Sequence, residues 1–125
     1  VHVAQVLGQD PKRAFKTLVA KGASGTYHVF DIPTTDSLDL KKAAKAAGEK
    51  SIDLLPVKDI TAVTGYVRGG CSPVGMKKQY PTIFHQTALE FETIYVSAGK
   101  IGAQVEVEPR ALLDLLRAET ADIII

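Results

Sequence analysis

Cysteine, histidine, methionine and tryptophan are scarce in this 125-residue chain, which has one cysteine, three histidines, one methionine and no tryptophan. The single cysteine, Cys71, excludes an internal disulfide and a zinc site of several thiolates, and it fits the reducing cytoplasm. The histidines, His2, His28 and His85, have no spacing typical of metal ligands. We therefore expect no bound metal, and histidines that are structural or solvated.

Long hydrophobic runs and an excess of one charge are also absent. No apolar run approaches the ~20 residues of a membrane helix, so we expect no membrane partner. Fifteen basic residues stand against fourteen acidic ones, which gives a net charge of +1. This balance does not indicate a general nucleic-acid binder, but it permits a protein that holds only a short single-stranded end.

The chain does have enough apolar residues for one hydrophobic core. Hydrophobic residues make up 46% of it, and we expect residues 1–125 to form a single domain. Val3, Val6 and Leu7 have helical spacing at the very start, and Gly8 ends the run. We therefore expect the chain to begin inside a helix and to lack an N-terminal segment.

Strand and helix patterns alternate along the chain. The strand at 26–32 has apolar residues on both faces, as in an interior strand. The predicted strands are 16–20, 26–32, 81–84, 93–96 and 103–107, and the predicted helices are 11–15, 37–48, 56–64 and 109–117. The side chains expected to face the core include Leu40, Ala43, Ala44 and Ala47, then Val105 and Val107, then Leu112, Leu113, Leu115 and Leu116.

Lys16 and Thr17 are the first candidates for chemistry. Lys16 lies between Phe15 and Leu18, at the start of a predicted strand. A lysine that is partly desolvated there offers either a proton or a localised positive charge to a carbonyl group. The alternative is a surface lysine at a strand end, beside a threonine that only favours the strand.

A glycine-rich loop at 65–75 is the second candidate. Gly69 and Gly70 would let a ligand approach the backbone closely, and successive amides there could bind an anion or an oxyanion. The loop matches no nucleotide-binding fingerprint, and we expect no cofactor. Lys77 and Lys78 could form a short basic rim for the phosphates of a nucleic-acid end. The alternative is a purely structural loop.

Ser97 ends a predicted strand before a glycine turn, where its hydroxyl could point into a pocket or merely stabilise the turn. No nucleophile-elbow motif surrounds it. Cys71 has no visible acid–base partner, so a structural thiol is the simpler interpretation, and a redox role would need a resolving cysteine that the chain lacks.

Several of these segments together resemble the YbaK/EbsC family of aminoacyl-tRNA deacylases. This family is related to the editing domain inserted in bacterial prolyl-tRNA synthetases. The specific segments are TGYVRGGCSPVG at 64–75 and IYVSAGK at 94–100, supported in order by 15–18, 38–45, 77–78 and 81–82. The resemblance runs over essentially the whole chain.

The resemblance implies a mixed α/β (α+β) fold with a twisted, barrel-like mixed sheet and peripheral helices. It also implies hydrolysis of the ester that joins a wrong amino acid to tRNA. The usual substrate is cysteine on tRNA(Pro), cleared by attack of the substrate's own thiol, with prolyl-tRNA synthetase as a partner. The family's lysine and threonine fall on Lys16 and Thr17, its loop glycine on Gly69 and its pocket serine on Ser97.

One position departs from the family pattern and keeps other functions open. Family members carry an aspartate seven residues after the pocket serine, whereas this chain has Gln104. A deacylase that removes alanine or another small residue with an activated water is therefore the second hypothesis. A non-catalytic module that binds an aminoacyl-tRNA end or a synthetase is the third.

Overall fold

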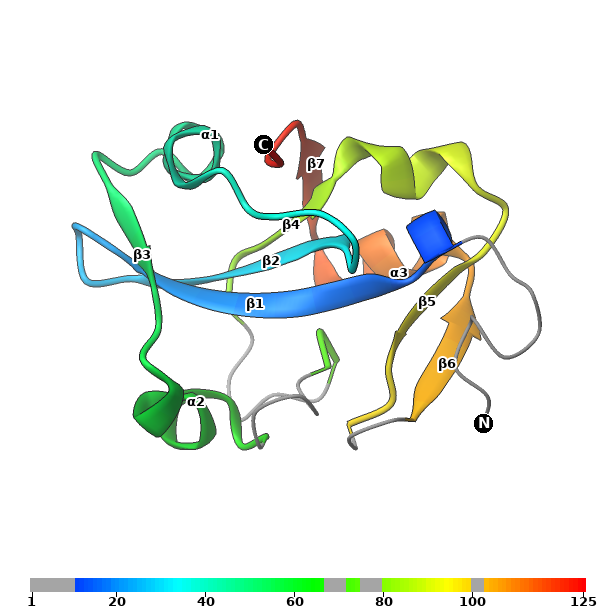
Figure 1. The fold of residues 1–125 in the computed structure, drawn as a ribbon, viewed down its shortest axis with the longest axis horizontal. Coiled ribbons are helices and arrows are strands. Elements are labelled where there is room, and N and C mark those ends of the chain that lie inside the picture. The colour runs from blue at the N-terminus through cyan, green and yellow to red at the C-terminus, as the bar shows by residue number, and fades with distance from the viewer. Residues whose placement is uncertain (1–10, 67–71, 75–79, 100–102) are drawn as a thin grey trace.

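The structure is a computed structural model that describes residues 11–66, 72–74, 80–99 and 103–125 (Figure 1). The strands are β1 (Phe15–Gly22), β2 (Tyr27–Pro33), β3 (Ile52–Leu54), β4 (Thr82–His85), β5 (Ile94–Ser97), β6 (Gln104–Val107) and β7 (Glu119–Ala121). The helices are α1 (Leu40–Ala47), α2 (Val57–Thr64) and α3 (Pro109–Leu116), with 3-10 turns at Pro11–Arg13 and Gln86–Glu90. The mixed α+β prediction is confirmed.

Five strands form one mixed sheet in the order β3-β1-β2-β4-β7. β1 pairs antiparallel with β2 and β3, while β4 runs parallel to β2 and to β7. The antiparallel hairpin β5–β6 is a second sheet, joined to the first by a parallel bridge between Ala14 and Tyr95. The described strands curve toward a barrel without closing it (Figure 1).

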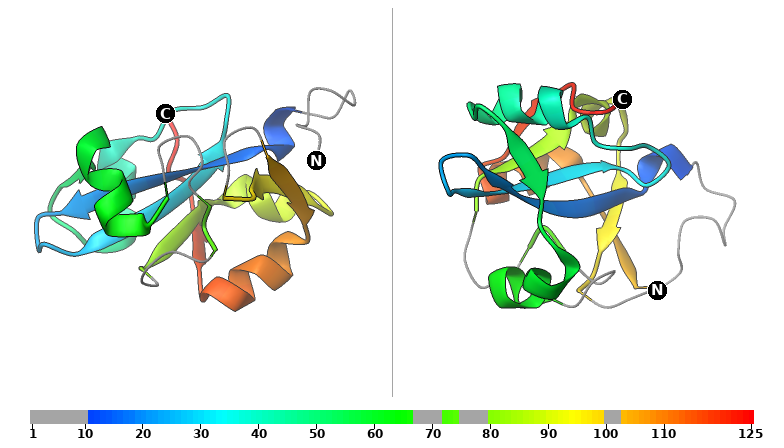
Figure 2. Two further views of the ribbon diagram at one scale, coloured as in Figure 1. Left: turned by 90° about the horizontal axis from the view of Figure 1, so that it is seen from below. Right: turned by 60° about the vertical axis from the view of Figure 1, so that its left-hand side comes forward.

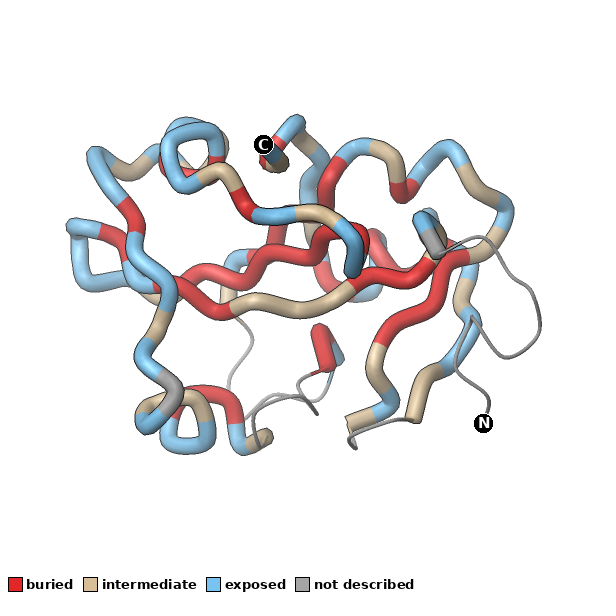
Figure 3. The backbone as a smooth tube through the Cα atoms, in the orientation of Figure 1, coloured by how far each residue is buried: buried red, intermediate tan, exposed pale blue. Residues whose placement is uncertain are grey.

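The two faces of the central strands support two hydrophobic clusters. On one face, Phe30 and Ile32 of β2 pack under α1 with Ala43 and Ala44. On the other face, Phe84 of β4 packs with Phe15 and residues of β5 and α3. Figure 2 shows α1 on one side of β1 and β2 and α2 on the other. β2 is buried along nearly its whole length, as predicted for an interior strand (Figure 3).

Helix α1 begins and ends at the residues that its capping chemistry favours. The Asp39 side chain accepts hydrogen bonds from the backbone N–H groups of Lys41 and Lys42. Gly48 ends the helix with a φ of 72°, a left-handed conformation that glycine adopts at low cost. The prediction that Leu40 belongs to the buried stripe is wrong, because Leu40 lies in the first turn and is 39% exposed.

Other sequence expectations also need correction. Val105 and Leu115 are exposed rather than buried. Val105 lies opposite Val96 near the turn of the β5–β6 hairpin, and neither Val105 nor Leu115 belongs to the cluster that Val107, Leu112 and Leu116 contact. The predicted helix at 11–15 is only a three-residue 3-10 turn, after which Phe15 already belongs to β1. The elements not predicted are the short strands β3 and β7 and the 3-10 turn at Gln86–Glu90.

Two histidines have structural roles, as predicted. His28 lies 2.7 Å from a carboxylate oxygen of Glu49, and that carboxylate also accepts a hydrogen bond from the Ser24 hydroxyl. His85 accepts a hydrogen bond from the backbone N–H of Ile123. These contacts tie the β1–β2 turn and the C-terminal residues to the sheet. His2 lies outside the described residues. Within the described segments, no helix is long and apolar enough to cross a membrane.

Candidate functional site

The first half of β1 lies at an open edge of the sheet, between the places where β3 and β5 make contact. β3 pairs with β1 only over Ala20–Gly22, and β5 meets the segment before β1 at the Ala14–Tyr95 bridge. Lys16, Thr17 and Leu18 lie between these two contacts, and each is half-buried (Figure 3). The backbone of Val19 accepts a hydrogen bond from Leu55 on this edge. In a strand, the backbone N–H and C=O groups of every second residue point to the same edge. Those of Thr17, like those of Val19, therefore point to the open edge.

The side chains of Lys16 and Thr17 point to opposite faces of β1. Lys16 lies opposite Ile32 of β2, whose side chain belongs to the cluster under α1. Thr17 lies opposite Asp31, on the face shared with Phe15 and Phe84. A lysine side chain is long and flexible, so Lys16 can reach a ligand at the open edge from its own side.

Asp31 is a member of this region that the sequence analysis missed. It is fully buried in the middle of β2, and its Oδ1 accepts a hydrogen bond of 2.5 Å from the Thr17 hydroxyl. Burial raises the pKa of Asp31 to about 8, although the hydrogen bond from Thr17 opposes the shift. The available signal was an aspartate inside an otherwise apolar strand, where this residue type is depleted.

Ser97 and Gln104 lie directly opposite each other at the turn end of the β5–β6 hairpin. The Ser97 hydroxyl oxygen accepts a hydrogen bond of 3.1 Å from the backbone N–H of Gly99, as expected for a serine that stabilises a turn. β5 runs parallel to the segment before β1 at the Ala14–Tyr95 bridge, and Lys16 and Ser97 each lie two residues beyond it. The fold therefore places Lys16, near the start of β1, beside the end of β5 that carries Ser97.

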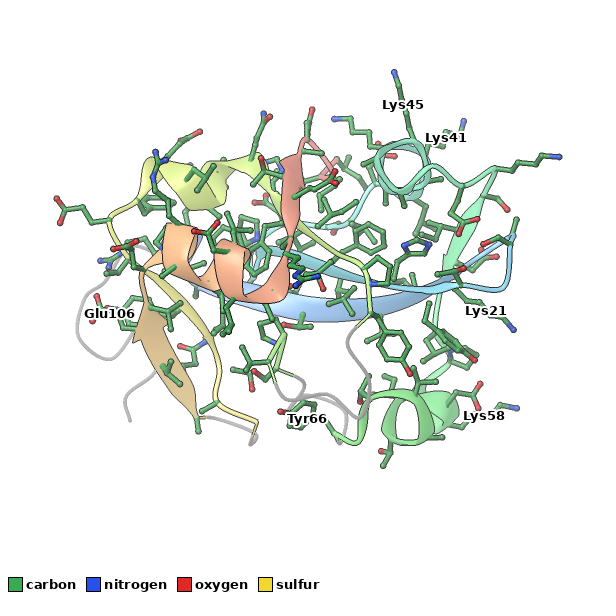
Figure 4. All side chains as sticks on the ribbon, turned by 180° about the vertical axis from the view of Figure 1, so that it is seen from behind. Lys21, Lys41, Lys45, Lys58, Tyr66 and Glu106 are labelled. Atoms are coloured by element: carbon green, nitrogen blue, oxygen red, sulfur yellow. The ribbon has the colours of Figure 1, made fainter. Side chains whose placement is uncertain are left out.

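Tyr66 connects the glycine-rich loop to the same hairpin. Its hydroxyl donates a hydrogen bond of 2.5 Å to the carbonyl oxygen of Val74, which spans the loop. A Cβ atom built on Gly99 would lie 3.0 Å from the Tyr66 ring, and Gly99 has a φ of 93°. Figure 4 shows Tyr66 beside α2, on the side of β1 where that hairpin ends. The loop thus starts against the turn that follows Ser97.

The remaining predicted site residues, Gly69, Gly70, Lys77 and Lys78, lie outside the described residues, as does Cys71. Within the described segments, no group of three or more histidine, cysteine, aspartate or glutamate side chains could hold a metal ion. The polar groups that surround the open edge are a lysine, two hydroxyls, an amide and a buried acid. Such groups can position a carbonyl compound and stabilise developing charge.

A separate cleft of about 410 Å³ lies at the other end of β1, where the β1–β2 hairpin faces the start of α2. Lys21, Tyr27 and Asp59 are among its lining residues, together with segments of β3. The Lys21 ammonium lies 5.7 Å from the centre of the Tyr27 ring, so part of this surface is already occupied by an internal contact. The predicted site residues are not among those that line this cleft.

The fold and these residues define a small domain that can hold a polar ligand beside an open strand edge. Comparison with known proteins identifies the family: the profile described as an aminoacyl-tRNA editing domain matches residues 1–115. The chain belongs to this aminoacyl-tRNA editing family, which confirms the resemblance seen in the sequence and makes it an aminoacyl-tRNA deacylase by class. The hypothesis of a non-catalytic binding module is set aside.

Individual relatives agree with this assignment. The chain is 50% identical, over 97% of its length and 74% of the relative's, to EbsC of Enterococcus faecalis, provisionally named a Cys-tRNA(Pro)/Cys-tRNA(Cys) deacylase. A crystal structure of a protein provisionally described as a trans-editing enzyme for prolyl-tRNA synthetase superimposes with a TM-score of 0.89 at 27% identity. That match covers 98% of this chain and 76% of the other. A scaffold used for epitope grafting matches equally well, at 29% identity over 98% and 77% of the two chains.

Proposed function

We propose that this chain removes cysteine from mischarged tRNA(Pro), acting in trans as a single editing domain in the cytoplasm. The observation that carries the proposal is the 50% identity to EbsC over 97% of the chain. The structural similarity to a protein described as a trans-editing enzyme for prolyl-tRNA synthetase supports tRNA(Pro) as the carrier and that synthetase as a partner.

The proposed reaction uses the substrate's own thiol as the nucleophile. The cysteine sulfur attacks the carbonyl carbon of its ester, so that a carbon–sulfur bond forms and the bond to the ribose oxygen breaks. The thiol proton passes to that oxygen, which restores the tRNA hydroxyl, and the amino acid leaves as a thiolactone that water later opens. The protein then needs to position the thiol and to stabilise developing charge, without a nucleophile of its own.

Each site residue has a role in this scheme. Lys16 stabilises negative charge at the carbonyl or holds the 3′-terminal nucleotide, and Thr17 hydrogen-bonds the substrate beside it. The amides of Gly69 and Gly70 orient the aminoacyl group, and Ser97 and Gln104 line the pocket. Lys77 and Lys78 contact the phosphates of the tRNA end. The described positions of Lys16, Thr17, Ser97 and Gln104 around one open edge support this arrangement.

One observation favours a second substrate. Gln104 replaces the aspartate of the family pattern and lies directly opposite Ser97. A neutral amide in place of a carboxylate changes both the charge and the hydrogen-bond donors of the pocket wall. Alanine on tRNA(Pro), removed by an activated water, is therefore the alternative.

A comparison of three substrates tests the proposal. The purified protein is incubated with Cys-, Ser- and Ala-tRNA(Pro), prepared by chemical acylation, and the released products are identified. A thiol with a pKa near ~8.5 supplies thiolate at neutral pH, whereas the hydroxyl of serine is a weak nucleophile and alanine has none. We expect release from Cys-tRNA(Pro) alone. Equal release from all three would mean that water attacks, and the alternative would replace the proposal.

A further inference from the structure

The contact between Thr17 and Asp31 is unusual for a purely structural interaction. Asp31 is fully buried, and its Oδ1 lies 2.5 Å from the Thr17 hydroxyl oxygen. Its second oxygen, Oδ2, is also buried and has no hydrogen-bond partner among the described residues. In the sheet, Asp31 lies between Thr17 of β1 and Phe84 of β4, with Val29 two residues before it on the same face.

This arrangement is unfavourable for stability. A carboxyl group among apolar neighbours loses its hydration, and an unpartnered oxygen adds to that loss. An apolar side chain of similar volume would fit the same position with less penalty. Groups that are held at such a cost are concentrated at functional sites. Asp31 contacts the hydroxyl of Thr17, the residue that follows Lys16 in β1. A functional role of Asp31 therefore acts through Thr17.

The hydrogen bond determines what Thr17 can offer a ligand. A hydroxyl group has a single proton, and Thr17 donates it to Asp31. Its oxygen is left with lone pairs only, so a ligand group that meets Thr17 must be a hydrogen-bond donor. Thr17 is half-buried at the open edge of β1, where a ligand can reach it, whereas Asp31 behind it is inaccessible.

Near the reacting carbonyl of a cysteinyl-tRNA, the donors are the α-ammonium group, the neighbouring ribose hydroxyl and the thiol, which is a weak donor. The ammonium is favoured because a hydrogen bond from a charged donor is stronger than one from a neutral hydroxyl or thiol. We propose that Thr17 binds the α-ammonium of the aminoacyl ester, and that Asp31 is the positioning residue that holds Thr17 as an acceptor. This inference rests on the proposed function and adds the recognition of the free amino group.

A substrate without the amine tests it. The protein is given Cys-tRNA(Pro) and the same tRNA carrying 3-mercaptopropionate, which has the thiol but no amino group. Each kcat/KM is divided by the uncatalysed rate of loss of that ester, because the ammonium itself activates the carbonyl. A hydrogen bond to a charged group corresponds to about a 10–100-fold preference for the cysteinyl ester in the wild type.

Variants separate positioning from structure. Thr17→Val and Asp31→Leu are expected to lose the preference, while Asp31→Leu melts at or above the wild-type temperature. Thr17→Ser keeps a hydroxyl and is expected to retain the preference. Thr82→Val is the matched control, since Thr82 is a buried threonine on the same sheet face whose hydroxyl donates to the Tyr80 carbonyl. It is expected to keep the full preference.

The outcomes distinguish this inference from the proposed function. Equal normalised rates for both esters in the wild type would overturn the inference and leave the cysteine deacylase intact. Loss of the preference in Thr17→Val but not in Asp31→Leu would overturn the role of Asp31. Failure to clear either ester would overturn the proposed function and the inference together.

Discussion

The two faces of the β1–β2 pair differ in what they bury. Under α1, the side chains of Phe30 and Ile32 pack against alanines of the helix, and the half-buried Lys16 lies on the same face at the start of β1. On the opposite face, Thr17 and Asp31 place a hydroxyl and a carboxyl group in the middle of the sheet. The first face buries an apolar cluster, whereas the second places polar groups inside the sheet at a cost in stability, beside the open edge of β1.

The first prediction concerns a substitution in the apolar cluster under α1. Phe30→Ala removes a fully buried ring and leaves a cavity, so it is expected to lower the free energy of unfolding by about 3–5 kcal/mol. Chemical denaturation measures the loss. Because Phe30 is fully buried and lies opposite Leu18 rather than Lys16, kcat/KM per folded molecule should stay near wild type. If Phe30→Ala does not fold, Phe30→Leu provides the same comparison. A folded variant with abolished turnover would show that the α1 face also shapes the site.

The second prediction concerns the polar face and pH. The folded pKa of Asp31, about 8, lies above the ordinary aspartate value of 3.8, so the folded state binds an extra proton between these two pH values. The contribution of Asp31 to stability is therefore fully present below pH ~4 and is lost as the pH rises toward 8. The slope reaches at most about 1.4 kcal/mol per pH unit.

Denaturation curves of the wild type and Asp31→Asn between pH 5 and 8 measure this effect. The amide cannot ionise, so the variant should show a flatter dependence over this range. The lowered pKa values of Glu49, Glu106 and Asp122 act at more acidic pH and are common to both proteins. Parallel curves for the two proteins would contradict the assignment of a raised pKa to Asp31.

The third prediction compares two glycines with the same backbone conformation. Gly25 and Gly99 both have a φ of 93°, but a Cβ on Gly25 would meet nothing within 4 Å, while one on Gly99 would meet Tyr66. Gly99→Ala is therefore expected to destabilise the protein by about 1 kcal/mol more than Gly25→Ala. It should also lower kcat/KM, because Tyr66 joins the glycine-rich loop to this turn. Identical effects of both substitutions would show that the Tyr66 contact is unimportant.

The smallest effect is expected from Cys71→Ser. The proposed reaction takes its thiol from the substrate, so replacing the protein's only thiol should leave turnover of Cys-tRNA(Pro) unchanged. Single-turnover kinetics and circular dichroism check activity and fold together. Loss of activity with intact secondary structure would make Cys71 a participant and would refute substrate-thiol attack.

The sequence predicts the apolar face better than the polar one. The spacing of Ala43 and Ala44 and the caps Asp39 and Gly48 define α1 because they are local signals. The strands β3 and β7 are only three residues long and form by pairing with strands distant in the sequence, so no local periodicity predicts them.

The site shows the same limit. Lys16, Thr17, Ser97 and Gln104 could be named from motifs, but the opposite orientation of Lys16 and Thr17 follows from the register with β2. The role of Asp31 also depends on that register, since only pairing places it against Thr17. Tyr66 lies close to Gly99 although the two residues are more than thirty positions apart in the chain, so no local pattern predicts this contact.

The most direct test of the account is the rate of cysteine release from Cys-tRNA(Pro) by Lys16→Ala. Lys45→Ala is the matched control, because Lys45 is an exposed lysine on α1, away from the open edge (Figure 4). Loss of a charge-stabilising group predicts a decrease of about 10²–10³-fold in kcat for Lys16→Ala, with wild-type melting, and no change for Lys45→Ala. Wild-type turnover by a folded Lys16→Ala protein would contradict the placement of the reaction at the open edge of β1.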